Sequence, residues 1–291
     1  MNDLKLSLII ISAIGLSACS SSGREDNADK PTVTVSIEPQ RQILEHLAGD
    51  RFEVVTLLSR GSDPETFDPS LSIRRKADIS KAYFAIGVFP FEKNIGKSLP
   101  GTVSFIDVSG GIEPLYGTHG HAHCHHGDAH DGHEEADPHI WTSVSNMKRM
   151  AANMAAALAE MDSVGRPVYK ERLAALISHL DSLDQSLNDK VKGTKAFAIW
   201  HPSLSYFARD YGLNQIAVGH ESKEMPAKRL KEVIDSAKCH NVKILFYQKE
   251  YDSRQVESLS NAMGSRLVEI DPMAYDWENE LIKIADELAR P

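Results

Sequence analysis

Short apolar and β-branched runs alternate with amphipathic helical stretches along most of this chain. In the first half, the pattern predicts strands at 32–37, 52–58, 83–86 and 102–106 and helices at 40–47 and 73–81. In the second half, it predicts strands at 196–200, 215–218, 243–247 and 267–270 and helices at 204–211, 227–237 and 253–263. Strands that alternate with helices form parallel sheets with helices on both faces. We therefore predict an α/β fold of two lobes, each with a roughly four-stranded parallel sheet flanked by helices.

A long helix over 167–191 is predicted between the two halves. Pro167 suits a first helical turn. Five leucines alternate three and four positions apart and form one apolar stripe: Leu173, Leu176, Leu180, Leu183 and Leu187. Such a helix is about 35 Å long and can reach both lobes. A coiled coil is disfavoured because the stripe covers fewer than three to four heptads. The predicted boundaries are 31–166 for the N-terminal lobe, 167–191 for the linker helix and 192–291 for the C-terminal lobe.

The start of the chain has the pattern of an export signal. The apolar run from Leu6 to Leu16 is shorter than the roughly 20 residues of a membrane span. It ends in Leu16-Ser-Ala-Cys19, which resembles a bacterial lipobox, so 1–18 is predicted to be a lipoprotein signal peptide and Cys19 the lipidated residue. An ordinary signal peptide with a coincidental cysteine is the alternative. Residues 19–30 are predicted to be a flexible tether. The mature protein would be exported and anchored to a membrane without spanning it, facing the periplasm or the cell exterior.

Composition narrows the class of partner. The formal net charge of -9 argues against nucleic acid. Beyond Cys19 only Cys124 and Cys239 remain, and two cysteines do not make a disulfide framework. The roughly 260 residues beyond the tether are enough for one large domain or two smaller lobes. We expect a monomer.

Eight of the thirteen histidines lie between residues 117 and 139. A neutral imidazole is the commonest side-chain ligand for zinc, copper and nickel. The segment has four glycines and no apolar periodicity, so a helix or a strand is not expected there. We predict a metal-collecting loop over 117–136, in preference to a chance polar linker. Its candidate ligands are His119, His121, His123, Cys124, His125, His126, His130 and His133.

Four further residues are candidates for a metal site at the strand ends, where open α/β sheets bind their ligands. His201 and Asp271 directly follow predicted strands. Glu65 lies a few residues past another strand, and His139 precedes a helix expected to begin near Ser145. Two imidazoles and two carboxylates can make a four-ligand site for a divalent cation. Each residue has an ordinary role as an alternative, such as a turn or a solvated loop, but together they favour a metal site.

Several motifs carry a resemblance to a known family. They are Val35-Ser-Ile-Glu-Pro39, Asp63-Pro-Glu-Thr-Phe-Asp-Pro69, Asp137-Pro-His-Ile-Trp141, His201-Pro-Ser-Leu-Ser-Tyr-Phe207 and Ile270-Asp-Pro272. On these motifs the chain resembles the TroA-like metal-binding lipoproteins of bacterial ABC importers, and most closely the zinc-binding ZnuA-type branch. The resemblance covers nearly all of the mature chain. A histidine-rich loop just before the second ligand is typical of the zinc branch.

The resemblance implies two lobes joined by a rigid helix, with one metal site in the cleft between them. His139 and His201 match ligands of the family, and Asp271 matches its carboxylate ligand in the second lobe. Glu65 stands where the family has a histidine. Either Glu65 ligates directly, or the site has three strong ligands plus water or a loop histidine. A second carboxylate favours manganese or iron, whereas the imidazole-rich loop with Cys124 favours zinc. We therefore expect Zn²⁺ as the transported ion, with Mn²⁺ as the alternative.

The implied function is to capture the ion and deliver it to an ABC transporter permease, without catalysis. A zinc-dependent hydrolase with Glu65 as general base is an alternative, but the chain lacks the His-Glu-x-x-His and Gly-x-Ser-x-Gly motifs. A surface metal buffer or adhesin without a permease is a third possibility. Gln248 occupies a place where family members often have a glutamate, and we do not expect it to ligate. His220 and Glu221 are expected to be surface residues, with an outer-shell role as the alternative.

Overall fold

The fold is described from a computed structural model of the chain, over residues 30–58, 61–116, 136–219, 227–249 and 253–290. The predicted signal peptide, Cys19 and nearly all of the tether lie outside these residues. The eight candidate ligands of the histidine-rich loop, His220 and Glu221 also lie outside them. Among the described residues, no helix has both the length and the apolar character needed to cross a bilayer.

The N-terminal lobe is built on a parallel sheet of four strands within the described residues. The strands are β1 (Thr32–Val35), β2 (Glu53–Thr56), β3 (Ala82–Ala85) and β4 (Ser104–Asp107), in the order β2-β1-β3-β4. The helices of this lobe are α1 (Glu38–Ala48), α2 (Leu71–Asp78), α3 (Pro90–Ser98) and a 3-10 turn, η1 (Gly49–Arg51). Both α1 and α3 have a proline in the first turn, where the missing N–H costs no hydrogen bond.

The C-terminal lobe repeats this architecture. Its strands are β5 (Ala196–Ile199), β6 (Asn214–Ala217), β7 (Ile244–Gln248) and β8 (Arg266–Ile270), all parallel and in the order β6-β5-β7-β8. Its helices are α6 (Ser205–Asp210), α7 (Ala227–Cys239), α8 (Ser253–Met263) and α9 (Trp277–Ala289). The predicted α/β fold with two parallel sheets is thereby confirmed.

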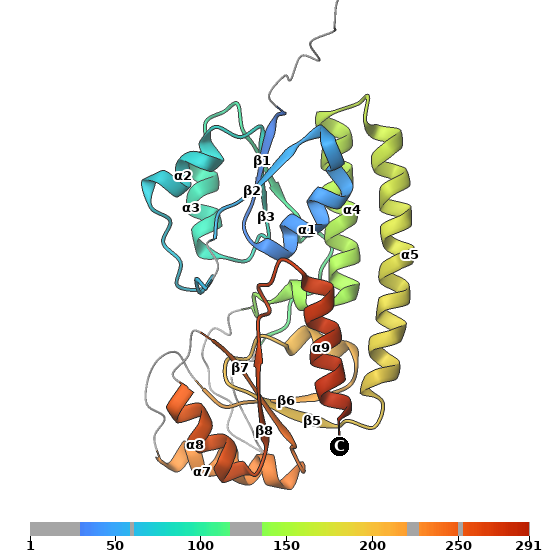
Figure 1. Cartoon of the computed structure of the whole chain (residues 1–291). Coiled ribbons are helices and arrows are strands. Elements are labelled where there is room, and N and C mark those ends of the chain that lie inside the picture. Colours follow the sequence, from blue (N-terminus) through green and yellow to red (C-terminus); the bar gives the residue numbers. More distant parts are fainter. Residues whose placement is uncertain (1–29, 59–60, 117–135, 220–226, 250–252, 291) are drawn as a thin grey trace, which may run out of the picture.

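Two long helices run beside the lobes (Figure 1). A 3-10 turn, η2 (Ile140–Thr142), leads into α4 (Val144–Met161), and α5 (Arg166–Val191) follows. The helix α5 begins one residue before the predicted linker helix, packs on α1, α4 and α9, and buries four of the five leucines of its predicted stripe. It therefore contacts elements of both lobes.

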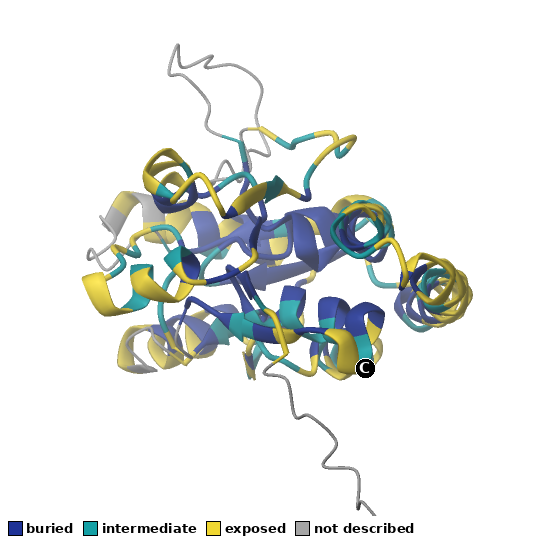
Figure 2. Cartoon of the chain, turned by 90° about the horizontal axis from the view of Figure 1, so that it is seen from above, coloured by how far each residue is buried: buried dark blue, intermediate teal, exposed yellow. Residues whose placement is uncertain are grey.

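One hydrophobic core extends through both lobes. It includes Phe84 of β3, Met150 of α4, Leu180 of α5 and Phe197 of β5. Buried segments accordingly lie at the centre of the molecule, and exposed residues lie on the outer faces of the helices (Figure 2). A smaller cluster lies between β5–β7 and the pair α7 and α8. The shared core ties the lobes together, because opening them widely would expose apolar surface to water.

Candidate metal centre

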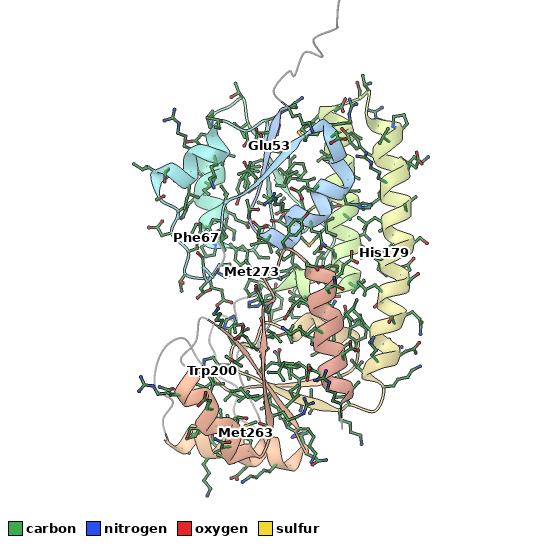
Figure 3. All side chains as sticks on the ribbon, viewed as in Figure 1. Glu53, Phe67, His179, Trp200, Met263 and Met273 are labelled. Carbon is green, nitrogen blue, oxygen red and sulfur yellow. The ribbon has the colours of Figure 1, made fainter. Side chains whose placement is uncertain are left out.

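Three of the four predicted ligands lie together at the junction of the lobes. Within the part of the chain that the structure describes, Glu65, His139 and His201 form a group whose ligand atoms all lie within 4.8 Å of one another. Glu65 lies in the loop between β2 and α2, His139 directly precedes η2, and His201 lies just beyond β5. Phe67 and Met273 are labelled close to this junction in Figure 3. The carboxyl ends of strands from two different sheets therefore supply one site.

The imidazole of His139 is held in one orientation by Asp137. Asp137 is fully buried, and its Oδ1 accepts hydrogen bonds from both the backbone N–H and Nδ1 of His139, each at 2.9 Å. A carboxylate can only accept, so the proton lies on Nδ1 and the lone pair of Nε2 is directed into the group of ligands. Burial lowers the pKa of His139, but the charges of Asp137 and Glu65 and the hydrogen bond outweigh it, so the pKa lies above 6.5.

The imidazole of His201 faces that of His139 across the lobe junction. Their Nε2 atoms are 3.1 Å apart, and their rings are 5.0 Å apart between centroids and inclined by 70°. Two nitrogen lone pairs approach this closely only when a proton lies between them. A divalent cation can replace that proton, because both nitrogens are then ligands of one ion.

The carboxylate of Glu65 completes a triangle with the two imidazoles. Its Oε1 lies 3.6 Å from Nε2 of His139 and 3.6 Å from Nε2 of His201. The loop is shaped by Asp63, which accepts hydrogen bonds from the Glu65 N–H at 2.9 Å and from the hydroxyl of Thr66 at 3.1 Å. This side-chain-to-backbone turn fixes the direction in which Glu65 leaves the loop. Because Oε1 of Glu65 is equally far from the two Nε2 atoms, it can serve as the third ligand of an ion that both imidazoles bind.

Asp271 is not brought to the other three residues. Its side chain is exposed, and its Oδ1 accepts a hydrogen bond from the Met273 N–H at 3.0 Å. Its own N–H donates to Glu280 at 2.8 Å. The carboxylate thus caps the turn after β8, while the next two residues of the chain, Pro272 and Met273, face the site.

A small cavity of about 20 Å³ opens at the two imidazoles. Its lining includes His139, His201, Trp141, Pro272 and Gln248. Gln248 is the last residue of β7 and is 3% exposed. Its place at a strand end beside the site was visible in the sequence, but the direction of its side chain was not. Asp137 was likewise part of a recognised motif, and its spacing of two from a histidine was the signal of its role.

Buried hydrogen bonds hold the lobes together beside the site. The indole N–H of Trp141 donates to the Pro272 carbonyl at 2.8 Å, and that of Trp277 donates to the Trp141 carbonyl at 2.8 Å. The hydroxyl of Tyr206 donates to the Asp137 carbonyl at 2.9 Å. Each bond joins the segment around η2 to the C-terminal lobe, so the site is closed on this side.

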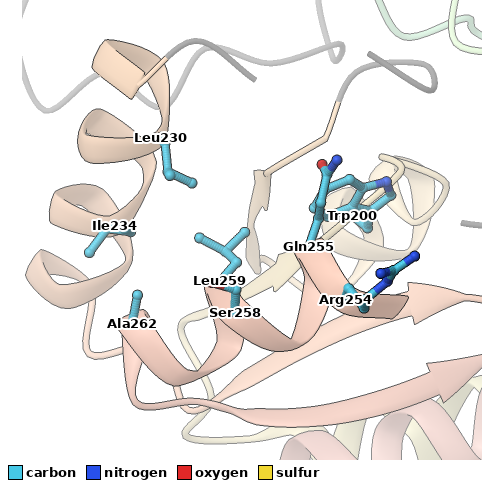
Figure 4. A pocket seen from close by; sticks show the side chains of 8 residues that line it. All are labelled: Trp200, Leu230, Ile234, Arg254, Gln255, Ser258, Leu259 and Ala262. Atoms are coloured by element: carbon cyan, nitrogen blue, oxygen red, sulfur yellow. The ribbon is translucent and has the colours of Figure 1, made fainter. Parts of the chain in front are cut away.

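A larger groove of about 380 Å³ lies elsewhere, between α7 and α8 (Figure 4). It is lined by Trp200, Leu230, Ile234, Arg254, Gln255, Ser258, Leu259 and Ala262. None of these side chains is an imidazole or a carboxylate. The groove therefore has a different chemistry from the metal centre.

Several known proteins have related sequences and structures. The high-affinity zinc uptake system protein ZnuA of Bacillus subtilis is 24% identical over 268 residues, which cover 89% of this chain and 83% of that protein. A crystal structure of ZnuA superposes with a TM-score of 0.79 at 33% identity and covers 90% of this chain and 98% of its own. A zinc-bound deletion mutant of ZnuA superposes with a TM-score of 0.78 at 33% identity, and the match covers 90% of this chain and 97% of the mutant.

A family profile matches almost the whole folded part of the chain. It is described as "Zinc-uptake complex component A periplasmic", and it aligns with residues 33–288. This span contains both sheets, the long helix α5 and all three grouped ligands. The chain therefore belongs to the ZnuA family of periplasmic zinc-uptake components.

Proposed function

We propose that this protein captures Zn²⁺ between its two lobes and delivers it to an ABC transporter permease. The observation that carries the proposal is the convergence of two imidazole nitrogens and one carboxylate oxygen, contributed by both lobes, on one point. The relatives support the choice of cargo, because they include a zinc uptake protein and a zinc-bound ZnuA.

The ligand set suits zinc better than manganese. Zinc is commonly held by two imidazoles and one carboxylate with a fourth, small ligand. Manganese favours a larger share of oxygen ligands. The second carboxylate of the predicted set, Asp271, is engaged in its own turn. Mn²⁺ would be preferred only if that turn rearranged on binding.

Protons compete with the ion for the site. The Nε2 atoms of His139 and His201 are 3.1 Å apart, which fits a hydrogen bond between the two imidazoles. Binding needs both nitrogens as lone-pair donors, so uptake weakens as the pH falls and the imidazoles become protonated. The bonds around Trp141 and the shared core resist wide opening of the lobes. We therefore expect release by a local shift of the loop that carries Glu65, the most exposed of the three ligands.

The geometry does not favour a hydrolase. The carboxylate of Glu65 lies close enough to both imidazoles to bind the same ion, so it would not be free to act as a general base. A cavity of about 20 Å³ is also far smaller than the roughly 300 Å³ or more of a typical small-molecule site. Both features suit the capture of a metal ion rather than the binding of an organic substrate.

The histidine-rich loop is proposed to raise the local metal concentration, as an effective-concentration device. Deleting residues 118–135 should lower the number of zinc ions bound per chain and leave one tight site. Loss of all tight binding in this deletion would show that the cleft is not the site. The lipobox supports a lipid anchor at Cys19, and Cys19→Ser should release the protein from membranes.

Transport is tested in cells that lack the gene. Such cells should grow poorly when a chelator limits zinc, and the wild-type gene should restore growth. A gene carrying His139→Ala should not, although the protein is exported in equal amount. Normal growth of the deletion strain under zinc limitation would instead support a surface buffer or an adhesin.

A further inference from the structure

Gln248 has a carboxamide oxygen that points away from its own hydrogen-bond partners. The side chain leaves the carboxyl end of β7 and is 3% exposed. Its Nε2 donates to the His201 carbonyl at 3.2 Å and to the hydroxyl of Ser203 at 2.7 Å. The amide is thus anchored to the segment that carries one of the ligands.

These partners fix the orientation of the amide. A carbonyl oxygen can only accept, so the nitrogen of Gln248 must face His201, and Oε1 must lie on the other side. Oε1 is buried and has no hydrogen-bond partner among the described residues. Buried acceptors in native proteins nearly always have a partner, which can be water. Gln248 lines the same small cavity as His139 and His201, so a partner there would sit at the metal centre.

The size of the cavity selects the partner. A water molecule needs roughly 10–15 Å³ of such volume, and the cavity offers about 20 Å³. Three protein ligands leave one position of a tetrahedral zinc ion open. We propose that Gln248 is a positioning residue whose Oε1 accepts a hydrogen bond from a water bound to the captured ion. The inference rests on the proposed function and adds the fourth ligand to it.

An amide oxygen also selects against other small ligands. Oε1 can only accept, and the N–H groups of the amide are already used by His201 and Ser203. A water donates a hydrogen bond to Oε1, whereas an anion such as thiocyanate would be repelled by the partial negative charge of this oxygen. Gln248 therefore keeps the fourth position occupied by an exchangeable, neutral ligand that can leave with little electrostatic cost when the ion is released.

The test uses the full mature chain with one equivalent of Co²⁺, so that the tight site fills before the histidine-rich loop, and the visible and electron paramagnetic resonance spectra of Co²⁺ report its ligands. Water enriched in the magnetic isotope of oxygen should broaden the resonance of the wild-type protein, because one water is bound to the ion. Gln248→Met should still bind one Co²⁺, with a shifted visible spectrum and a thiocyanate affinity at least about tenfold higher. The matched control is Gln215→Met, which removes an amide that binds the Leu204 N–H and Ser205 in the same lobe.

The outcomes separate this inference from the proposed function. No isotope broadening in the wild-type protein would overturn the bound water, including the case in which Gln248 itself ligates. A Gln248→Met protein with the spectrum and thiocyanate affinity of the wild type would overturn the role of Gln248. In both cases tight one-to-one binding of Co²⁺ leaves the metal centre intact. Failure of the wild-type cleft to bind Co²⁺ or Zn²⁺ would contradict the proposed function as well. The wild-type measurement stands even if the variant does not fold.

Discussion

The Nε2 atoms of His139 and His201 lie 3.1 Å apart, although the residues are 62 positions apart and belong to different lobes. Asp137 keeps the Nδ1 proton on His139 and so directs its Nε2 toward His201. Glu65 approaches both nitrogens to 3.6 Å. An ion that replaces the shared proton is therefore bound by both lobes at once, and binding and lobe contact are expected to stabilise each other.

Asp137→Asn should weaken zinc binding by roughly 10- to 100-fold, the usual effect of losing a carboxylate that orients a ligating histidine. The substitution keeps an acceptor near Nδ1 of His139 but removes the charge that makes the imidazole a better ligand. Competition with a chromophoric chelator measures the change. Asp276→Asn, on the exposed turn before α9, is the control. An affinity equal to that of the wild type would show that Asp137 only shapes the backbone.

The two candidate carboxylates should behave differently. Glu65→Gln is expected to lower zinc affinity by at least about tenfold, because it replaces an anionic ligand by a weak neutral one. Asp271→Asn should change it by less than about threefold, since that carboxylate caps the turn to Met273 outside the grouped ligands. Isothermal titration of both variants decides between them. A larger loss in the Asp271 variant would mean that the turn rearranges and that Asp271 becomes a ligand on binding.

Trp141→Phe should lower the free energy of unfolding by about 2 kcal/mol, because it leaves a buried carbonyl of Pro272 without its donor and removes buried volume. It should also speed zinc release, because Pro272 and Met273 line the cavity. Chemical denaturation and stopped-flow chelation measure the two effects. Tyr275→Phe removes a hydrogen bond to Glu45, between the lobes but outside the cavity, and should leave the release rate unchanged. Equal release rates in both variants would contradict this account.

Glu92 makes stability depend on pH. It is fully buried, and burial raises its pKa from 4.5 to about 7, although Ser36 and the N–H groups of Ile86, Gly87 and Phe89 donate hydrogen bonds to it and act in the opposite direction. The folded state thus holds this proton more tightly than the unfolded state. Its stabilising contribution is fully present below pH 4.5 and is lost as the pH rises through about 7.

The corresponding variant is Glu92→Gln, which cannot titrate. As the pH rises from 4.5 to 7.5, the free energy of unfolding of the wild type should fall relative to that of the variant by at most about 3 kcal/mol, which corresponds to a pKa raised from 4.5 to about 7. Urea unfolding at several pH values measures it, with Glu53→Gln on the exposed face of β2 as the control. A constant difference over this range would contradict the raised pKa.

Much of the fold could be predicted because local sequence patterns indicate most of its helices and strands. The buried strands are short apolar runs, and the leucine stripe of α5 has a helical period, so their positions were predicted to within a few residues. The helix α3 was missed because it has few apolar residues, and its start depends on the proline turn and on Glu92. The helix α9 was also missed, although the spacing of Trp277, Leu281, Ile284 and Leu288 carries a helical signal.

The candidate site was predictable only in part. The positions of Glu65, His139 and His201 beyond strands or before a helix could be read from the sequence, and the structure brings them together. The direction of Asp271 could not, because an aspartate before a proline can cap its own turn as easily as bind a metal. The role proposed for Gln248 depends on the orientation of its amide, which its hydrogen bonds to His201 and Ser203 fix only in the folded protein.

The most direct test of the account is a titration of the metal-free protein with zinc and manganese, in the wild type and in His201→Ala. We predict one tight zinc site in the wild type and weaker binding of manganese. In His201→Ala the zinc affinity of this site should fall by at least about 100-fold, because losing a ligand lowers the affinity more than losing a group that orients a ligand. His240→Ala, at the end of α7, should bind zinc like the wild type. Undiminished zinc binding in His201→Ala, or a preference of the wild type for manganese, would contradict a zinc site between the lobes.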